Sequence, residues 1–371
     1  MDWRFFRNVL IKGLVLFLAL NLIFAAWNPA GLGKVSAYNH LFPGRSRFPF
    51  GEIPAQAYNL SLFDLDAMFA SHVIAGAPKA IDEYRVILVG DSSVWGTLLR
   101  PEETLAGRLN AAGLTLCDGR SLRVYNLGYP TISLTKDLMI LAEAMRYQPD
   151  LVVWPLTLEA FPADKQLTSP IVAHNAARVQ ALIHTYGLPF DPNDPTLIQP
   201  TFWDNTFIGQ RRDLADLARL QLYGVLWAAT GVDQVYPSDY QPAQTEFDSD
   251  VSFHDQQPPL LDQAKLAFDV IAAGVHAAGK TPILIVNEPM LIGTGKNSNL
   301  RYNFFYPRWA YDQYRQMMSA RSQLDGWKYL DLWDIIPATE FTNSAIHLTP
   351  AGEAIFAERV GEAIRQEACL R

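Results

Sequence analysis

The stretch Arg85–Leu99, RVILVGDSSVWGTLL, places an apolar run directly before Gly-Asp-Ser-Ser. An apolar run without alternating polar residues is typical of a strand that is buried on both faces of a parallel sheet. A serine between such a strand and the next helix lies beside free backbone N–H groups that can hold an oxyanion. Because serine also caps helices, Ser92 or Ser93 is either a nucleophile or a helix cap.

Four further apolar runs repeat this pattern, and helical patterns separate them. The five runs are YRVILVG (84–90), LRVYNLG (122–128), PDLVVWPL (149–156), TPILIVNEP (281–289) and WKYLDLWD (327–334). Strands that alternate with helices predict a doubly wound α/β domain, here with five parallel strands. The ligand crevice of such a sheet lies at the carboxyl ends of its strands, so functional residues are expected there.

The first segment of the chain is basic and then apolar. Arg4, Arg7 and Lys12 precede or enter an apolar run over Val9–Trp27 that is nearly long enough to cross a bilayer. Basic residues on the amino side favour a cytoplasmic N-terminus and an extracytoplasmic body. We predict a transmembrane anchor over 1–27, and a cleaved signal peptide is the competing interpretation, although no Ala-x-Ala site follows the run.

Composition excludes several classes of function. The chain has 371 residues and a formal net charge of −8, which indicates no nucleic-acid partner. Its two cysteines, Cys117 and Cys369, exclude a disulfide framework and a Cys-rich zinc site, but they can pair in an oxidising compartment. No motif indicates a metal or cofactor site.

Three segments follow from changes in sequence pattern. Residues 28–80 are rich in Gly, Pro, Ser and aromatics without a sustained period, which predicts an ordered stalk. The domain proper covers 81–371 and contains an insertion at about 161–259 after the third strand, too long to be a simple connection and predicted to carry its own helices. Within it, the helical pattern 213–231 is either a buried packing helix or an element that faces a membrane or an acyl chain.

A histidine near the C-terminus bears on the choice at Ser92. His347 lies in EFTNSAIHLTPAGEAIFAERVGEAI (340–364), between the fifth strand and the last amphipathic helix. The predicted topology places this loop in the crevice that holds Ser92. A neutral imidazole within hydrogen-bond reach of a hydroxyl activates it, so the pairing favours Ser92 as a nucleophile.

Three motifs together resemble the SGNH, or GDSL, hydrolase superfamily. They are GDSSVWG (90–96), NLG (126–128) and HLTPAG (347–352). The resemblance spans roughly 83–365 apart from the insertion, and it implies a flavodoxin-like three-layer α/β/α fold and serine acyl transfer. By these motifs Ser92 corresponds to the nucleophile and an oxyanion donor through its amide, Gly128 to the second donor, and His347 to the general base.

One departure from the superfamily concerns the oxyanion hole. Where the superfamily usually has a side-chain donor, this chain has Glu159, with Thr157 close by. A carboxylate donates a hydrogen bond only when it is protonated. Either Thr157 donates, or burial holds Glu159 neutral, or the oxyanion hole is incomplete.

A second departure concerns the group that orients His347. Three residues before this histidine, where the superfamily has aspartate, the chain has Ser344, with Asn343 beside it. Either side chain can accept the Nδ1 proton, and Asp334 or Glu340 can replace them if the loop folds back. The orienting group therefore stays open among these four.

Further strand-end residues are predicted to line the substrate site. They are Asp91, Asn287, Glu288, Tyr306 and Arg308. Asn287 and Glu288 end the fourth apolar run, where polar side chains often face a ligand. Tyr306 and Arg308 belong to an aromatic stretch that either binds the faces of a sugar or packs its loop onto the body.

The resemblance implies a membrane-anchored, extracytoplasmic serine esterase or O-acyltransferase that forms an acyl-Ser92 intermediate. It also implies an O-acylated glycan as the substrate and a membrane-bound acyltransferase as a partner. Two alternatives stay open: a non-catalytic protein that binds a glycan or a membrane protein, and a lipid-directed esterase. The mechanism requires no cofactor.

Overall fold

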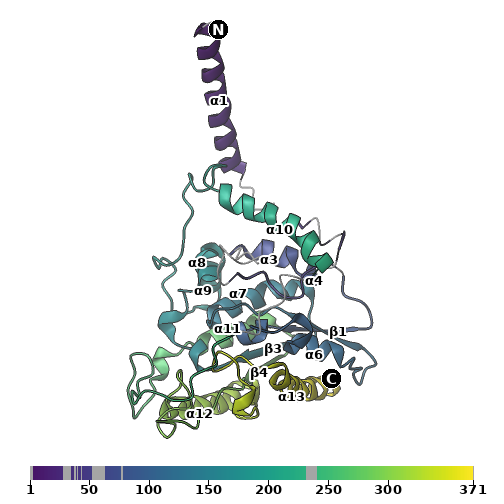
Figure 1. Cartoon of the computed structure of the whole chain (residues 1–371), viewed down its shortest axis with the longest axis vertical. Coiled ribbons are helices and arrows are strands. Elements are labelled where there is room, and N and C mark those ends of the chain that lie inside the picture. Colours follow the sequence, from purple (N-terminus) through teal and green to yellow (C-terminus); the bar gives the residue numbers. More distant parts are fainter. Residues whose placement is uncertain are drawn as a thin grey trace.

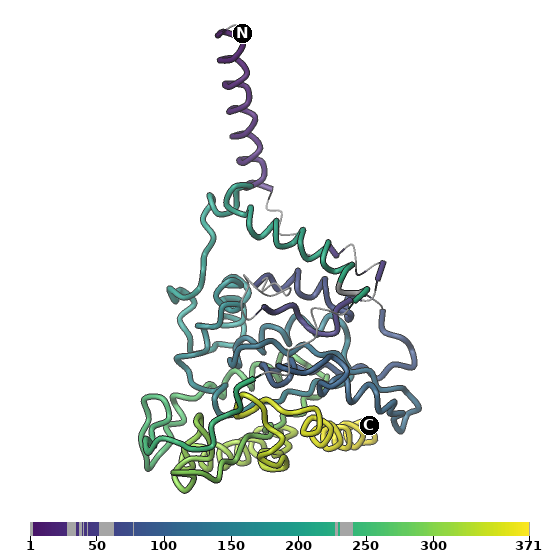
Figure 2. The backbone as a smooth tube through the Cα atoms, viewed as in Figure 1, coloured from purple at the N-terminus to yellow at the C-terminus, as the bar shows by residue number. Residues whose placement is uncertain are grey.

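The computed structural model describes residues 3–27, 35–36, 39, 41–42, 44–51, 63–76, 78–230 and 240–370, except the side chains of 227 and 228. The described residues form a body from which one long helix projects (Figure 1). This helix, α1 (Trp3–Trp27), carries the amino end at its tip, whereas the carboxyl-terminal helix packs onto the body (Figure 2). By length and composition, α1 is the one described helix that can cross a membrane.

A parallel sheet forms the centre of the body, and its five described strands lie in the order β2-β1-β3-β4-β5. The strands are β1 (Glu83–Leu88), β2 (Ser121–Asn126), β3 (Leu151–Leu156), β4 (Ile283–Asn287) and β5 (Lys328–Asp331). They coincide with the five predicted apolar runs. In the register, Leu88 of β1 pairs with Asn126 on one side and Val153 on the other. The chain reverses its direction across the sheet between β1 and β3, which is where ligands bind in sheets of this order.

Helices cover both faces of the sheet (Figure 1). One face packs against α7 (Leu134–Ala144), α11 (Phe268–Ala278) and α12 (Arg308–Asp325), and the other against α6 (Leu105–Ala111) and α13 (Pro350–Cys369). Side chains along β1 and the residue after it alternate between the two faces of the sheet, so that Ile87 and Val89 enter the first core and Val86 and Leu88 enter the second. This arrangement confirms the predicted three-layer α/β/α fold with a five-stranded parallel sheet.

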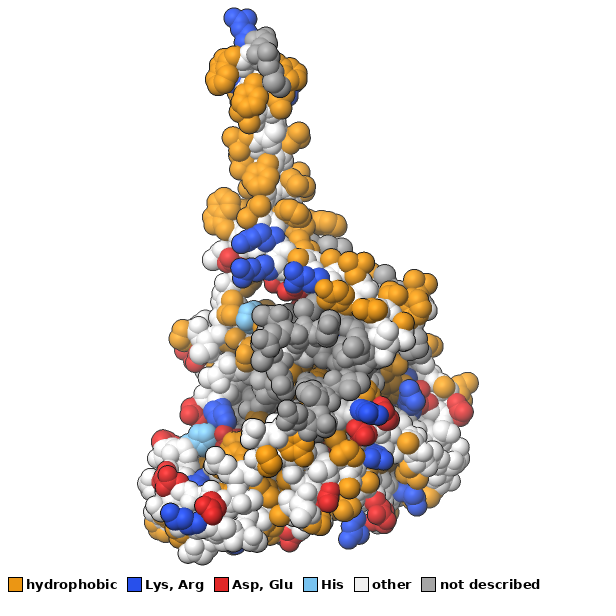
Figure 3. All heavy atoms as spheres, viewed as in Figure 1, with side chains coloured by type: hydrophobic (Ala, Val, Ile, Leu, Met, Phe, Trp, Pro, Cys, Tyr) orange, Lys and Arg blue, Asp and Glu red, His pale blue; other side chains and the backbone are white. Residues whose placement is uncertain are grey.

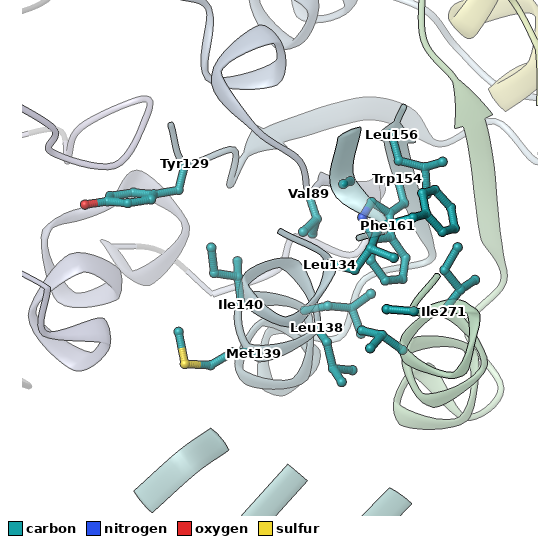
Figure 4. Packing of buried hydrophobic residues seen from close by; sticks show 14 of the residues in the cluster. Val89, Tyr129, Leu134, Leu138, Met139, Ile140, Trp154, Leu156, Phe161 and Ile271 are labelled. Carbon is teal, nitrogen blue, oxygen red and sulfur yellow. The ribbon is translucent and has the colours of Figure 1, made fainter. Parts of the chain in front are cut away.

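The larger core lies between the sheet and α7. Figure 4 shows Leu134 and Leu138 of α7 near Trp154 of β3 and Ile271 of α11. All four side chains are fully buried. The indole Nε1 of Trp154 donates to Oδ2 of the buried Asp137 at 3.1 Å, so the large ring has a polar partner inside the core.

The described parts of the predicted stalk, 44–51 and 63–76, belong to the body, so the prediction is corrected there. Phe48 and Phe69 are fully buried in the larger core, and their rings meet at 5.1 Å. Two short helices, α3 (Leu65–Ser71) and α4 (Val73–Gly76), form most of the second part, and their buried apolar side chains belong to the larger core. Of the other residues of 28–80, the structure describes 35–36, 39, 41–42 and 78–80.

The insertion after β3 contains α8 (Pro170–Ala173), α9 (Ala176–Tyr186) and α10 (Arg211–Thr230). Side chains of α8 and α9, including Val172 and Val179, are buried in the core beside α7. By contrast, α10 lies across the foot of α1 and keeps much of its surface exposed (Figure 1). Residues 231–239, where the predicted helix 213–231 ends, lie outside the described part of the chain.

Candidate active site

A sharp turn after β1 presents Ser92 at the carboxyl edge of the sheet. The short helix α5 (Ser92–Trp95) begins there, and the side chain of Asp91 caps it by accepting from the amide of Ser93 at 2.8 Å. Helix α5 ends at Gly96, whose φ of 87° lies in the left-handed region that favours glycine. This geometry leaves the Ser92 side chain half-buried and free to meet the loop that follows β5.

Ser92, His347 and Asn343 form a chain of hydrogen bonds. The distance from Ser92 Oγ to His347 Nε2 is 2.8 Å, and the distance from His347 Nδ1 to Asn343 Oδ1 is also 2.8 Å. Since Asn343 Oδ1 only accepts, Nδ1 carries the proton and Nε2 accepts from the Ser92 hydroxyl. This is the arrangement in which an imidazole can remove a hydroxyl proton.

The loop after β5 crosses the sheet to bring His347 to Ser92. Strand β5 is at the edge of the sheet, and β3 and β4 lie between it and β1. The amide of Leu291, in the loop after β4, donates to the carbonyl of Ala345 at 2.7 Å and holds the crossing loop over the sheet. The amide of Thr342 closes the tip of the loop by donating to the carbonyl of His347 at 2.8 Å.

Electrostatics keep His347 in its neutral form. Burial lowers the pKa of His347 to about 4, although the negative charge of Asp91 raises it in part. The imidazole is therefore unprotonated at neutral pH and has a lone pair available. Asn343 orients the ring but adds no negative charge that would stabilise an imidazolium.

The other predicted orienting residues lie elsewhere. Asp334 is exposed at the surface. The carboxylate of Glu340 accepts from the Thr349 hydroxyl at the start of α13. Ser344 lies next to Asn343 in the same turn, but the side chain on Nδ1 is that of Asn343.

The predicted oxyanion donors Gly128 and Thr157 are already occupied. The Gly128 amide donates to Asn126 Oδ1 at 3.0 Å, so it does not offer the free N–H that this role requires. Packing explains why residue 128 is a glycine, because a Cβ there would lie 2.5 Å from the backbone nitrogen of Trp95. The Thr157 hydroxyl donates to the Tyr306 hydroxyl at 3.0 Å.

Glu159 is held as a carboxylate. Burial raises its pKa, but the hydrogen bond from His254 and the charge of Lys165 bring the pKa below its ordinary value. The His254 Nε2 to Glu159 Oε2 distance is 3.1 Å, and Lys165 donates to the other oxygen. Of the three alternatives for the oxyanion hole, the one in which burial holds Glu159 neutral is therefore wrong, because the hydrogen bond from His254 and the charge of Lys165 outweigh the desolvation. Glu159 and Lys165 line a cavity of about 300 Å³ that opens to solvent.

Three of the predicted substrate-contacting residues are part of the scaffold. Asn287 and Tyr306 are fully buried, and the amide nitrogen of Asn287 donates to Asp331 Oδ1 at 2.8 Å. The guanidinium of Arg308 stacks over the Tyr302 ring at 4.1 Å and donates to the Ser298 carbonyl at 2.6 Å. These contacts pack the aromatic loop onto the body and leave Asn287 and Tyr306 no surface for a ligand.

Glu288 contacts Ser93, the residue that follows Ser92. The Ser93 hydroxyl donates to Glu288 Oε2, which ties α5 to the end of β4. Burial and the nearby charge of Asp91 raise the pKa of Glu288 well above its ordinary value, which favours the protonated carboxyl. Its other oxygen is buried with no hydrogen-bond partner among the described residues.

A buried lysine that contacts the turn before Ser92 was not predicted. Lys136 Nζ donates to the carbonyls of Gly90 at 2.6 Å and Tyr129 at 3.0 Å, and it pairs with Asp137 at 2.6 Å. It thereby joins the loops after β1 and β2. The sequence signal for a buried lysine was the charged pair Lys136–Asp137 inside the apolar pattern SLTKDLMIL (133–141). By contrast, no local pattern indicated that His254 is the partner of Glu159. Across the described ranges, no group of three or more His, Cys, Asp or Glu side chains could hold a metal ion.

Comparisons with known proteins give distant similarities only. No protein-family model matches the chain, and no curated protein matches it. Solved structures similar to it include an aryl esterase from M. smegmatis, with 14% identity over 76% of this chain and 98% of that one and a TM-score of 0.33. A carbohydrate acetylesterase from Sinorhizobium meliloti has 13% identity over 76% and 97%, with a TM-score of 0.33. A family two carbohydrate esterase from Clostridium thermocellum has 11% identity over 78% and 65%, with a TM-score of 0.33. Identities and TM-scores this low do not establish the function of the chain.

Proposed function

We propose that this protein is a serine esterase or O-acyltransferase in which Ser92 is the nucleophile and His347 the general base. The observation that carries the proposal is the continuous hydrogen-bond chain from Ser92 through His347 to Asn343. Burial supports it further, because a neutral His347 can accept a proton at physiological pH.

In the proposed reaction, Ser92 Oγ attacks the ester carbonyl while its proton passes to His347 Nε2. The ester C–O bond then breaks, and the leaving alcohol takes the proton from His347. Water or the hydroxyl of a second molecule then attacks the acyl-Ser92 ester and gives its proton to Nε2. The bond between the acyl carbon and Oγ breaks, Oγ takes the proton from Nε2, and the acid or the new ester leaves.

The substrate and location are the finer part of the proposal. We propose an O-acylated extracytoplasmic glycan as the substrate, as the superfamily resemblance implies, and a membrane-bound acyltransferase as a partner. Helix α1 would anchor the chain, since its apolar side chains are exposed over a span-length segment. The disulfide between Cys117 and Cys369 supports an oxidising compartment outside the cytoplasm.

A fluorophosphonate probe tests the catalytic part on the full-length protein in detergent. We expect the wild type and Ser319→Ala, a control at an exposed serine of α12, to be labelled covalently. Ser92→Ala and His347→Ala should lose the labelling, with circular dichroism showing that both remain folded. Labelling that persists in Ser92→Ala would contradict the assignment of the nucleophile.

One observation favours a non-catalytic binding protein as the second candidate. Gly128 and Thr157 are both engaged in hydrogen bonds, and Glu159 is charged, so the Ser92 amide is the one predicted oxyanion donor left. Loss of one donor typically lowers turnover by about 10²–10³. Absence of any labelling in folded wild type would support this second candidate.

A comparison of acyl chains tests the substrate class. The glycan proposal predicts release of acetate from acetylated polysaccharide and a decline in kcat/KM as the acyl chain of a soluble ester lengthens. A rise in kcat/KM with chain length would instead support the lipid-directed esterase.

A further inference from the structure

The surface beside the foot of α1 is unusually apolar. It is formed by α10 and the segment before it, and we call it the α10 patch. Its members are the exposed side chains of Phe202, Trp203, Phe207, Ile208, Leu222 and Leu226. Trp203 is 70% exposed and Leu222 is 73% exposed, values that a helix or loop packed in a core would not have. Figure 3 shows hydrophobic side chains continuing from α1 over α10.

Specific contacts join the patch to α1. The Ile208 amide donates to Asn21 Oδ1 at 3.1 Å, and the Phe207 ring meets Phe24 edge-on at 5.6 Å. Asn21 is the polar residue that interrupts the apolar run of α1, and it is buried by this contact. The patch therefore begins on the same apolar surface that α1 would present to lipid.

The depth of the contact fits an interfacial position. Trp27 ends α1 and suits the headgroup level, where indole rings concentrate. Asn21 is six residues away, which corresponds to about 9 Å along a helix. An interfacial helix buries its apolar side chains roughly 5–10 Å into the headgroup and acyl boundary.

The two faces of α10 differ in what they contact. Leu220 and Gly224 are buried toward the body near α3 (Leu65–Ser71), so one face holds the helix in place. The outward face carries Leu222 and Leu226 one turn apart. Its amino-terminal half adds exposed Arg211, Arg212 and Arg219, and Figure 3 shows Lys and Arg side chains gathered where α1 meets α10.

We propose that the α10 patch lies in the headgroup region of an anionic phospholipid bilayer, with its apolar side chains inserted and its arginines on lipid phosphates. The inference rests on the anchoring by α1 proposed above. Arginine is suited to this position because it binds phosphate while its aliphatic stem stays in apolar surroundings. The body is then held against the membrane at two places, and a tilt away from the bilayer would expose the patch to water.

Fluorescence quenching in nanodiscs tests this orientation with the full-length chain. Single cysteines carry an environment-sensitive dye at Leu222→Cys, at Leu16→Cys in α1 and at Leu324→Cys, which is 79% exposed on α12 far from α1. The native cysteines are paired and do not react. Nanodiscs contain phosphatidylcholine with or without phosphatidylglycerol and a lipid-borne nitroxide quencher.

We expect strong quenching at positions 16 and 222, weak quenching at 324, and a loss of quenching at 222 when phosphatidylglycerol is omitted. Equal, weak quenching at 222 and 324 beside strong quenching at 16 would overturn the inference and leave the anchor intact. Absence of quenching at 16 would overturn the anchor and the inference together, whereas the fluorophosphonate experiment reports independently on catalysis. Protection of 222 from aqueous iodide without lipid quenching would assign the patch to a protein contact instead.

Discussion

At His347, the atom on Nδ1 is an amide oxygen rather than a carboxylate. An amide fixes the ring orientation and the tautomer, which are two of the functions that a carboxylate serves in a Ser-His-Asp triad. It does not supply charge, and burial therefore sets the basicity of the imidazole. A site of this kind keeps the imidazole neutral over a wide pH range, but the lowered pKa also makes the imidazole a weaker base.

The pH dependence of kcat/KM follows from this environment. We expect activity on a soluble ester to fall as the pH drops through about 4, because only the neutral imidazole accepts the Ser92 proton and burial lowers the pKa of His347 to about 4. In Asn343→Asp, a carboxylate beside Nδ1 should raise that pKa and move the acidic limb upward.

Matched measurements separate this effect from loss of structure. Asn343→Ala should lower kcat by about tenfold without moving the limb, since one net hydrogen bond is lost. Each enzyme is incubated at the lowest pH and assayed again at pH 7 to exclude unfolding. A wild-type limb near 6.5, or an unmoved limb in Asn343→Asp, would contradict the expectation.

At the scale of elements, buried polar groups connect the strand ends around the turn that carries Ser92. Ser93 bonds to Glu288 after β4, and Lys136 of α7 bonds to the carbonyl of Gly90 after β1. Asn126 links β2 to α5 by donating to the Val94 carbonyl at 2.7 Å. These bonds fix the short helix α5, whose four residues would not hold their position alone.

Glu288 provides a test of this arrangement. Glu288→Gln should change the free energy of unfolding by less than about 1 kcal/mol at pH 7, since burial raises the pKa of Glu288 and favours its neutral form, and glutamine still accepts from Ser93. Glu288→Ala should cost about 2–4 kcal/mol through the cavity and the unpaired serine. Urea unfolding of both variants checks this, and an equal loss in both would contradict the expectation that glutamine can replace the native carboxyl.

At the scale of the whole molecule, two features connect distant parts of the chain. Helix α1 and the α10 patch bring the amino end and the insertion to one surface. The disulfide from Cys117 to Cys369 joins the loop before β2 to the end of α13 across 252 residues. It connects the end of α13 to the loop after α6, and these two helices form the second core together with the sheet.

Removal of the disulfide should lower stability without a change in fold. Cys117→Ser/Cys369→Ser is expected to lose about 2–4 kcal/mol, because the cross-link restricts the unfolded chain. Urea unfolding in detergent measures this, and reduction of the wild type should lower the midpoint to the same extent. A wild type whose midpoint does not respond to reductant would contradict the prediction.

Local pattern was sufficient for the architecture of this protein. Apolar runs identify strands buried on both faces, and the rules of parallel α/β sheets then bring the ends of β1 and β5 to one edge. For the same reason, Ser92 and His347 were expected in one crevice, and the structure places Oγ and Nε2 2.8 Å apart. Their catalytic roles stay predictions.

Which polar atoms meet was decided by tertiary structure. The pKa of Glu159 is lowered by Lys165 nearby in the sequence and by His254, which is 95 residues away. The Thr157 hydroxyl donates to the hydroxyl of Tyr306, which is 149 residues away. The aromatic segment with Phe48 has the pattern of a stalk, and only the folded structure shows that Phe48 is buried in the larger core. Periodicity in a sequence reports which side chains avoid water, because that depends on each residue and its neighbours. Hydrogen-bond partners and shifted pKa values depend on groups from separate elements, and only the folded chain brings those together.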